Sequence, residues 1–417
     1  MRPIGIDLFA GAGGLSLGFE QAGFDVAAAV EIDPVHCAVH EFNFPNCTTI
    51  CRDVTKVAGP QIRDAAGLAR RDVDVVFGGA PCQGFSMIGR RALDDPRNAL
   101  VGHYVRLVRD IAPKYFVFEN VKGLTVGKHK LFLEEIVERL SSDYDVLLPY
   151  KVLNAANYGV PQDRHRLFLI GARKGLPLPK YPEPGTRVTV AEALSDIPDA
   201  ERFEELLGSD SVAAELRSPS AYARALREIG NKPTHFGYRR SYDPAILTSS
   251  MRAVHTRLSR KRFAATEPGQ TEPVSRFHKL DPSGVCNTLR AGTNADRGAF
   301  TSPRPIHYLY PRCITVREAA RLHSYPDWFR FHVTKWHGFR QIGNSVPPIL
   351  GRAVAQAIVA AMGVRPKPPK EILRLGDARL LEMTLAQAAR YYDVSTDVIG
   401  RRDRNYARES GNERRAA

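Results

Sequence analysis

The chain has 417 residues, a formal net charge of +14, and hydrophobic side chains at 43% of its positions. This length suits two domains, or one large domain with an insertion, and the composition is that of an ordinary globular protein. No apolar stretch is long enough to span a membrane, and an acid at position 7 argues against a signal peptide. We therefore expect a cytoplasmic protein.

Short apolar runs alternate with helical patterns over the first 172 residues. The runs predict strands at residues 4–9, 26–30, 73–77, 115–118 and 167–170. Helices are predicted between them, at residues 15–22, 36–42, 99–111 and 130–140. This alternation is typical of an α/β fold with a doubly wound, Rossmann-like sheet. Four prolines between positions 177 and 184 mark its edge, so we predict a first domain of residues 1–174.

Residues 175–285 are irregular and basic, and we predict that they form a second, smaller domain. Between positions 215 and 262, eleven Lys or Arg residues stand against three acidic ones, with aromatic side chains interleaved. This charge density indicates a polyanionic partner, nucleic acid first among them, and a solvated basic surface is the alternative. Residues 286–363 are predicted to return to the first domain, through helices at 316–323 and 347–362.

A proline-rich linker at 365–370 precedes a predicted helical tail, residues 371–417. Residues 384–399 predict a helix, a turn and a second helix with Ser395 as its N-cap. This pattern resembles a small helix-turn-helix, with Arg401, Arg402 and Arg404 as accessory DNA contacts. The alternative is a helical cap on the catalytic domain.

The six cysteines form no C-x-x-C pair and no disulfide framework, so we expect free thiols in a reducing compartment. Five His and Cys residues lie close together in the sequence: His36, Cys37, His40, Cys47 and Cys51. Their spacing matches no standard zinc pattern, so we expect no metal site.

A glycine-rich turn joins the first predicted strand to the first helix, with the sequence DLFAGAGG from Asp7 to position 14. Glycines here let the backbone approach a ligand closely. Ser16 stands where a dinucleotide fingerprint needs its third glycine, which favours a nucleoside without phosphates. Glu31, at the end of the second strand, is placed to accept hydrogen bonds from ribose hydroxyls, and Asp53 from an adenine amino group.

The candidate reaction site begins with Cys82, in the loop GGAPCQGFS that follows the strand at 73–77. A thiol there is well placed to be a nucleophile, and a small buried hydrophobe is the alternative. Glu119 ends the neighbouring strand, where apolar surroundings should raise its pKa and let it donate a proton. Arg164 and Arg166 point the same way on extended chain, suited to a phosphate or a base carbonyl, with surface ion pairs as the alternative.

Together these residues resemble the ordered motifs of the cytosine-C5 DNA methyltransferases of the bacterial restriction-modification type. The resemblance rests on residues 7–14, Glu31, Asp53, 81–83, 119–121, the Q-x-R-x-R pattern at 162–166, 315–322 and 341–348. It covers about residues 1–175 and 285–363, and the region between them falls where the family keeps its target-recognition domain. Arg52 departs from the pattern, because a small residue usually stands before this aspartate.

The resemblance implies methyl transfer from S-adenosyl-L-methionine to carbon 5 of a flipped cytosine, through a covalent bond between Cys82 and carbon 6. Glu119 would be protonated and face ring nitrogen 3. Arg166 would hold carbonyl oxygen 2, and Arg164 would steady the nucleotide or the Cys82 loop. Residues 84–98 resemble the mobile loop that closes over the flipped base.

The resemblance also implies a cofactor pocket. Phe9 would stack on the adenine, Pro81 would line the pocket, and Asn344 and Ser345 would complete it from the C-terminal side. The remaining expected cofactor residues are Asp7, Gly11, Gly14, Glu31 and Asp53.

The expected partner is double-stranded DNA with a specific target sequence, and a cognate restriction endonuclease would act on the same site. We expect a monomer. Candidate guanine contacts are Arg239, Arg240, Arg257 and Arg290. Two rival functions stay open: the same chemistry on transfer RNA, and DNA binding without catalysis. Intact Cys82, Glu119 and Arg164 argue against the second rival.

Overall fold

The computed structural model describes residues 2–68, 71–81, 99–126, 129–230, 234–292 and 304–398. Within these ranges an eight-stranded sheet has the order β3-β2-β1-β4-β5-β8-β6, and β7 pairs with β8. Its strands are β1 (Ile4–Leu8), β2 (Asp25–Glu31), β3 (Thr48–Cys51), β4 (Val75–Gly78), β5 (Tyr115–Val121), β6 (Tyr144–Val146), β7 (Lys151–Asn154) and β8 (His165–Arg173). The predicted doubly wound α/β fold is confirmed.

The first five strands of the sheet are parallel, and β8 runs antiparallel beside β5. Leu8 pairs with Gly78, and Gly78 pairs with Phe118, so β1 and β4 end at the same level and β5 continues beyond it to Val121. On β8 the register places Arg166 opposite Val121, near the end of β5. The start of β8 therefore meets the carboxyl edge of the parallel strands, which the alternating pattern in the sequence did not reveal.

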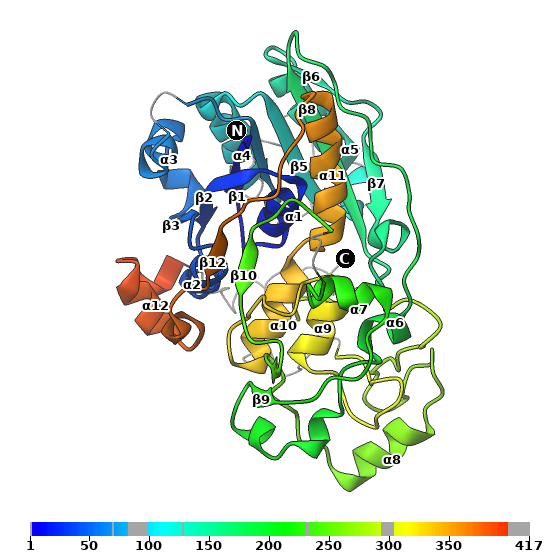
Figure 1. Cartoon of the computed structure of the whole chain (residues 1–417). Coiled ribbons are helices and arrows are strands. Elements are labelled where there is room, and N and C mark those ends of the chain that lie inside the picture. The colour runs from blue at the N-terminus through cyan, green and yellow to red at the C-terminus, as the bar shows by residue number, and fades with distance from the viewer. Residues whose placement is uncertain are drawn as a thin grey trace, which may run out of the picture.

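Helices cover both faces of the sheet (Figure 1). On one face lie α1 (Gly14–Ala22) and α11 (Pro348–Ala361), and on the other lie α3 (Gly59–Ala65), α4 (Ala99–Ile111) and α5 (His129–Leu140). A Cβ at Gly18 would lie 2.7 Å from the backbone nitrogen of Arg352, so only glycine lets α1 and α11 approach this closely. Helix α11, which belongs to the segment predicted to return to the first domain, packs on α1.

A smaller lobe lies below the sheet in Figure 1 and is built from both later segments of the chain. It holds β9 (Val212–Ala213), β11 (Ile246–Leu247), α6 (Val190–Leu194), α7 (Ala221–Leu226), α8 (Arg257–Ala265), α9 (Val316–Leu322) and α10 (Lys335–Asn344). Helices α9 and α10 belong to the segment expected to return to the first domain, yet α9 packs on α6.

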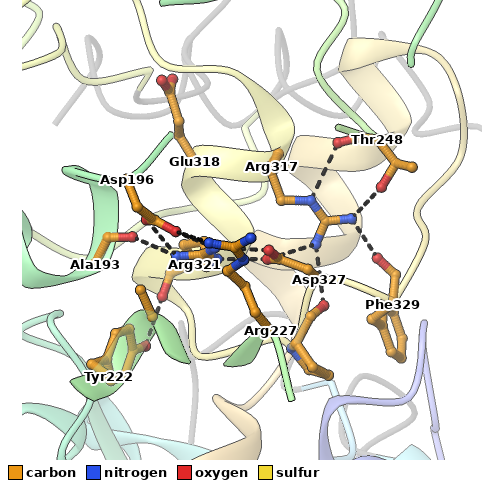
Figure 2. A network of polar contacts seen from close by, with 12 residues as sticks. Ala193, Asp196, Tyr222, Arg227, Thr248, Arg317, Glu318, Arg321, Asp327 and Phe329 are labelled. Carbon is orange, nitrogen blue, oxygen red and sulfur yellow. Dashed lines mark hydrogen bonds and ion pairs between the residues drawn. The ribbon is translucent and has the colours of Figure 1, made fainter. Parts of the chain in front are cut away.

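Buried arginines of α9 tie this lobe together (Figure 2). Arg321 donates to Asp196, which follows α6, at 3.1 Å, and it also pairs with Asp327. Arg317 donates to the Phe329 carbonyl at 2.8 Å and to the Thr248 hydroxyl at 2.7 Å. Because both guanidinium groups are fully buried, these partners replace the water that the charges lose.

The described part of the tail, which stops at residue 398, lies against the first domain. β12 (Ile372–Arg374) pairs in parallel with β10 (Arg239–Ser241), and α12 (Leu385–Tyr391) lies beside α2 (Pro34–Asn43) (Figure 1). The predicted first tail helix is thus present, and a 3-10 turn over Thr396–Val398 begins where the second was expected, with Asp397 donating its N–H to Ser395. Over the described residues, no helix has the length and apolar character needed to cross a membrane.

Candidate active site

The carboxyl ends of five parallel strands bring most of the predicted site residues to one edge of the sheet. Ligands of open α/β sheets bind at this edge, because the loops and helix amino termini gather there. The residues placed there are Phe9 and Gly11 after β1, Glu31 at the end of β2, Asp53 after β3, Pro81 after β4, and Glu119 on β5. Cys82 and the expected mobile loop at 84–98 lie outside the described residues.

The turn after β1 takes a backbone shape that favours glycine. Gly11 and Gly13 have φ of +57° and +99°, and Phe9 also has a positive φ of +62°. Above Gly11 the space is open, since a Cβ there would meet no described atom within 4 Å. At Gly14 a Cβ would lie 2.4 Å from the Val346 carbonyl oxygen, so the C-terminal segment closes directly over this turn.

Two carboxylates flank the open side of the turn. Glu31 accepts the Gly11 N–H at 2.8 Å through Oε2, and the Asp33 N–H at 2.9 Å through Oε1. Asp53 caps the short 3-10 turn that follows it by accepting the Thr55 N–H at 2.9 Å. Both side chains stay partly exposed, so their remaining lone pairs are free to accept hydrogen bonds from a ligand.

Asp7 has a different position from the one predicted. Its side chain is buried below the turn, where Oδ2 accepts the Ser16 hydroxyl at 2.6 Å and Oδ1 has no hydrogen-bond partner among the described residues. Burial raises the pKa of Asp7 to about 8, so the carboxyl holds its proton at neutral pH. We therefore correct the predicted role: Asp7 supports the turn from beneath and does not form its ligand-facing surface.

Glu119 and the backbone that leads to Cys82 are in direct contact. A Cβ at Gly79 would lie 2.3 Å from Glu119 Oε2, so the carboxylate reaches across the end of β4 only because position 79 is glycine. The next residue of β5, Asn120, donates its Nδ2–H to the Ala80 carbonyl at 2.9 Å. These contacts fix the backbone two residues before Cys82 relative to Glu119.

Arg166 holds the other oxygen of this carboxylate. Its Nε lies 2.9 Å from Glu119 Oε1, an approach made possible by the antiparallel pairing of β8 with β5. Burial raises the pKa of Glu119, and the charges of Arg166 and Arg164 only partly oppose this shift. A carboxyl of this kind can carry a proton into a reaction at higher pH than an exposed one.

Arg164 does not share the surface that Arg166 occupies. Its guanidinium is fully buried and donates to the backbone carbonyls of Leu289, Gly343 and Ser345, each at 2.7 Å. The expectation that Arg164 and Arg166 point the same way is therefore wrong, and the predicted support of the Cys82 loop by Arg164 falls on residues outside the described part of the chain. The residue instead holds the segment around Ser345 against the catalytic domain.

Two further residues complete this junction, although the sequence analysis assigned them no role. Gln162 Nε2 donates to His323 Nδ1 at 2.9 Å, and the Leu289 N–H donates to Gln162 Oε1. Burial keeps the pKa of His323 well below its usual value, so the ring is neutral and its Nε2–H donates to the Ser345 carbonyl at 3.1 Å. Gln162 is the first residue of the Q-x-R-x-R motif, and this motif is the sequence feature that could have identified it as a functional residue.

The C-terminal pair predicted to complete the cofactor pocket lies at the end of α10. Asn344 is exposed, and Ser345 is half-buried with its hydroxyl donating to the Ile342 carbonyl at 2.8 Å. Because Val346 closes over Gly14, this pair borders the glycine-rich turn.

The candidate base-reading arginines separate into two groups. Arg239, Arg257 and Arg290 are exposed. Arg240 is buried, pairs with Glu20 at 2.8 Å and lies 4.6 Å above the Trp328 ring, so its predicted DNA contact is wrong. The tail arginines at 401, 402 and 404 lie outside the described residues. Within the described residues, no cluster of three His, Cys, Asp or Glu side chains could hold a metal ion.

The Rossmann-like sheet, the glycine-rich turn and the buried Glu119 carboxyl beside Gly79 are the arrangement expected of a methyltransferase. The family model of C-5 cytosine-specific DNA methylases matches residues 4–360, and the chain belongs to this family. It is therefore a DNA cytosine methyltransferase.

Individual proteins agree with this assignment. The chain is 65% identical to the type II methyltransferase M.XorII of Xanthomonas oryzae pv. oryzae over 404 residues, covering 97% of this chain and 95% of the relative. It is 36% identical to M1.HphI of Haemophilus parahaemolyticus, covering 85% of this chain and 86% of that protein. A crystal structure described as a prophage-encoded DNA modification methyltransferase (E. coli) superposes with a TM-score of 0.72 at 34% identity, over 87% of this chain and all of the other.

Proposed function

We propose that the methyl donor is S-adenosyl-L-methionine, bound at the carboxyl edge of β1, β2 and β3. The residues present fit this molecule: Gly11 lies under open space, and Glu31 and Asp53 offer acceptors for ribose and adenine groups. Phe9 is partly exposed beside them and would stack on the adenine. When bound, this donor supplies a methyl group on a positively charged sulfur.

Cys82 is the nucleophile of this proposal. Its thiolate adds to carbon 6 of the cytosine, which breaks the ring conjugation and gives carbon 5 the electron pair that takes the methyl group. The proton on carbon 5 is then lost to a base, and the electrons of that bond expel the Cys82 thiolate. The cytosine must leave the base stack for this addition, because carbon 6 is covered inside a duplex.

The Glu119–Arg166 pair beside Gly79 is the observation that carries the proposal. As the thiolate adds, negative charge builds up on the ring around nitrogen 3, and a proton on Glu119 would offset it. The raised pKa of Glu119 favours this protonated form. Arg166 binds Oε1 of this carboxyl. The other oxygen, Oε2, lies over Gly79, at the start of the segment that leads to Cys82.

The remaining roles follow from the family and the charge distribution. We propose that the chain acts as a monomer on a specific duplex sequence and protects host DNA from a cognate endonuclease. The exposed Arg239, Arg257 and Arg290 are candidates for reading that sequence. The transfer RNA alternative has less support, because the matching family model is one of DNA methylases.

Transfer of a tritiated methyl group from S-adenosyl-L-methionine to DNA tests the proposal. We expect Cys82→Ala to abolish transfer while cofactor binding persists. A duplex carrying 5-fluorocytosine should trap wild-type protein as a denaturant-resistant adduct, because carbon 5 then has no proton to lose. Turnover by Cys82→Ala, or an equal adduct with that variant, would refute the nucleophile assignment.

A further inference from the structure

The C-terminal tail is built into the wall behind the glycine-rich turn. Leu380 and Leu381 are buried in one apolar cluster with Ala12 of that turn and with Val39 and Phe42 of α2. The Gly376 N–H donates to the Phe42 carbonyl at 2.8 Å, and a Cβ at Gly376 would lie 2.9 Å from Phe42 Cα. The tail therefore packs against the turn and the helix that follows Glu31, and Figure 1 shows the tail beside α2.

Two adjacent tyrosines hold one carboxylate of α2. Tyr391 donates its hydroxyl to Glu41 Oε1 and Tyr392 donates its hydroxyl to Glu41 Oε2, each at 2.7 Å. Hydrogen bonds from neutral donors to a charged acceptor are stronger than those between neutral groups. The pair thus fixes the last turn of α2 against the tail.

The amino end of α2 contacts the Glu31 carboxylate. Asp33 is the N-cap of α2, and its own N–H donates to Glu31 Oε1 at 2.9 Å. Ten residues of helix transmit a shift at Glu41 to this cap, because a helix of that length moves as a rigid unit. The Glu31 carboxylate in turn holds the Gly11 N–H of the turn.

The tail also reaches the other carboxylate of the pocket. Arg52, which stands immediately before Asp53, donates from Nη1 to the Asp393 carbonyl at 3.4 Å. This contact gives a physical reason for the departure from the family pattern at position 52. An arginine is long enough to meet the tail, and a small residue is not.

We propose that residues 371–398 are a positioning element for the cofactor pocket, acting through Tyr391 and Tyr392 on α2 and through Asp393 on the segment before Asp53. The inference rests on the proposed use of S-adenosyl-L-methionine at this edge. The tail sets the affinity for the cofactor, and it does not touch the reacting atoms. This assigns the described part of the tail a role distinct from an accessory DNA contact.

The test compares the full-length variant Tyr391→Phe/Tyr392→Phe with Glu41→Gln and with the combination of all three changes. The matched control is Tyr115→Phe/Tyr158→Phe, which removes two tyrosine hydrogen bonds to the Pro177 and Pro182 carbonyls, far from α2. Cofactor Kd is measured by calorimetry without DNA, the kinetics of methyl transfer give KM and kcat, and DNA Kd is measured over a salt series.

We expect the tail variant and Glu41→Gln each to raise the cofactor Kd and KM by about three- to tenfold, with kcat at saturating cofactor within about twofold of wild type. The triple variant should bind the cofactor no more weakly than either parent variant, because both sets of changes act on the same contact. DNA Kd and its salt dependence should stay unchanged, and the control should bind cofactor as wild type does.

An unchanged cofactor Kd in the tail variant would overturn the proposal, and so would additive effects in the triple variant. A change in the DNA salt slope in place of cofactor Kd would also overturn it, in favour of a DNA contact. Wild-type protein that fails to bind S-adenosyl-L-methionine would instead refute the proposed cofactor. Cofactor binding by the wild type is therefore measured before the variants are compared.

Discussion

The carboxylate of Glu119 lies so close over Gly79 that a Cβ at position 79 would sit 2.3 Å from Oε2. This contact links the carboxyl-terminal part of β5 to Gly79, which follows β4 and stands three residues before Cys82. The two partners differ in mobility: Gly79 directly follows Gly78, which is paired in the sheet, whereas Oε2 is the tip of a flexible side chain. Any side chain at this position therefore displaces the carboxylate before it displaces the fold.

Gly79→Ala should for this reason impair catalysis without unfolding the protein. A displacement of the reacting group by about 1 Å can cost about 100-fold in rate, so we expect kcat to fall by about this factor. Melting temperature and cofactor Kd should stay close to wild type. Gly185→Ala is the matched control, because a Cβ there meets nothing within 4 Å. Near-normal kcat in Gly79→Ala would show that Glu119 does not act from the observed position.

The buried carboxyl of Asp7 should make stability depend on pH. Its pKa of about 8 in the fold stands above the ordinary value of 3.8, so unfolding releases a proton between these two pH values. Stability from this group is present below about pH 4 and is lost as pH rises to about 8, by up to about 1.4 kcal/mol per pH unit.

Asp7→Asn removes that titration while keeping an oxygen that can accept from Ser16. We expect the variant to lose less unfolding free energy than wild type between pH 5 and pH 8, measured by urea denaturation at a series of pH values. Parallel pH dependences in the two proteins would mean that Asp7 is ionised in the fold.

Arg164→Ala should loosen the C-terminal segment and destabilise the protein. The change leaves three buried carbonyls, at Leu289, Gly343 and Ser345, without their charged donor. A loss of about 3 kcal/mol or more in unfolding free energy follows, together with weaker cofactor binding. Arg164→Lys should recover only part of both, since an ammonium cannot reproduce the planar fork. Full stability in Arg164→Ala would contradict a bracing role.

Neighbouring arginines on β10 should give opposite phenotypes. Arg240→Ala leaves Glu20 buried without its ion-pair partner, and we expect a cost of about 3–5 kcal/mol in unfolding free energy. Arg239→Ala, on the exposed side, should leave stability unchanged and weaken DNA binding. Urea denaturation and DNA binding over a salt series separate the two effects. Equal losses of stability would show that both side chains are structural.

Much of the fold could be predicted from sequence because its signals are local. Apolar runs and helical periodicity are properties of neighbouring residues, and they located β1, β2, β4, β5 and β8 together with α1, α2, α4 and α5, whereas α3 was missed. The ordered motifs at the strand ends then identified the family, since each motif is contiguous. Glu31 and Glu119 were found in this way, from a carboxylate placed at the end of an apolar strand.

Roles that depend on partners far away in the chain were decided only by the tertiary structure. Arg164 and Arg166 are two residues apart in the same motif, yet one is bound to carbonyls from position 289 onward and the other to Glu119. Arg239 and Arg240 are adjacent, yet only Arg240 is buried against Glu20. Sequence determined which chemical groups this protein possesses and their order along the chain. Packing determined which of them lose water and which face a ligand, because burial depends on the whole surroundings of a side chain and not on its neighbours in sequence.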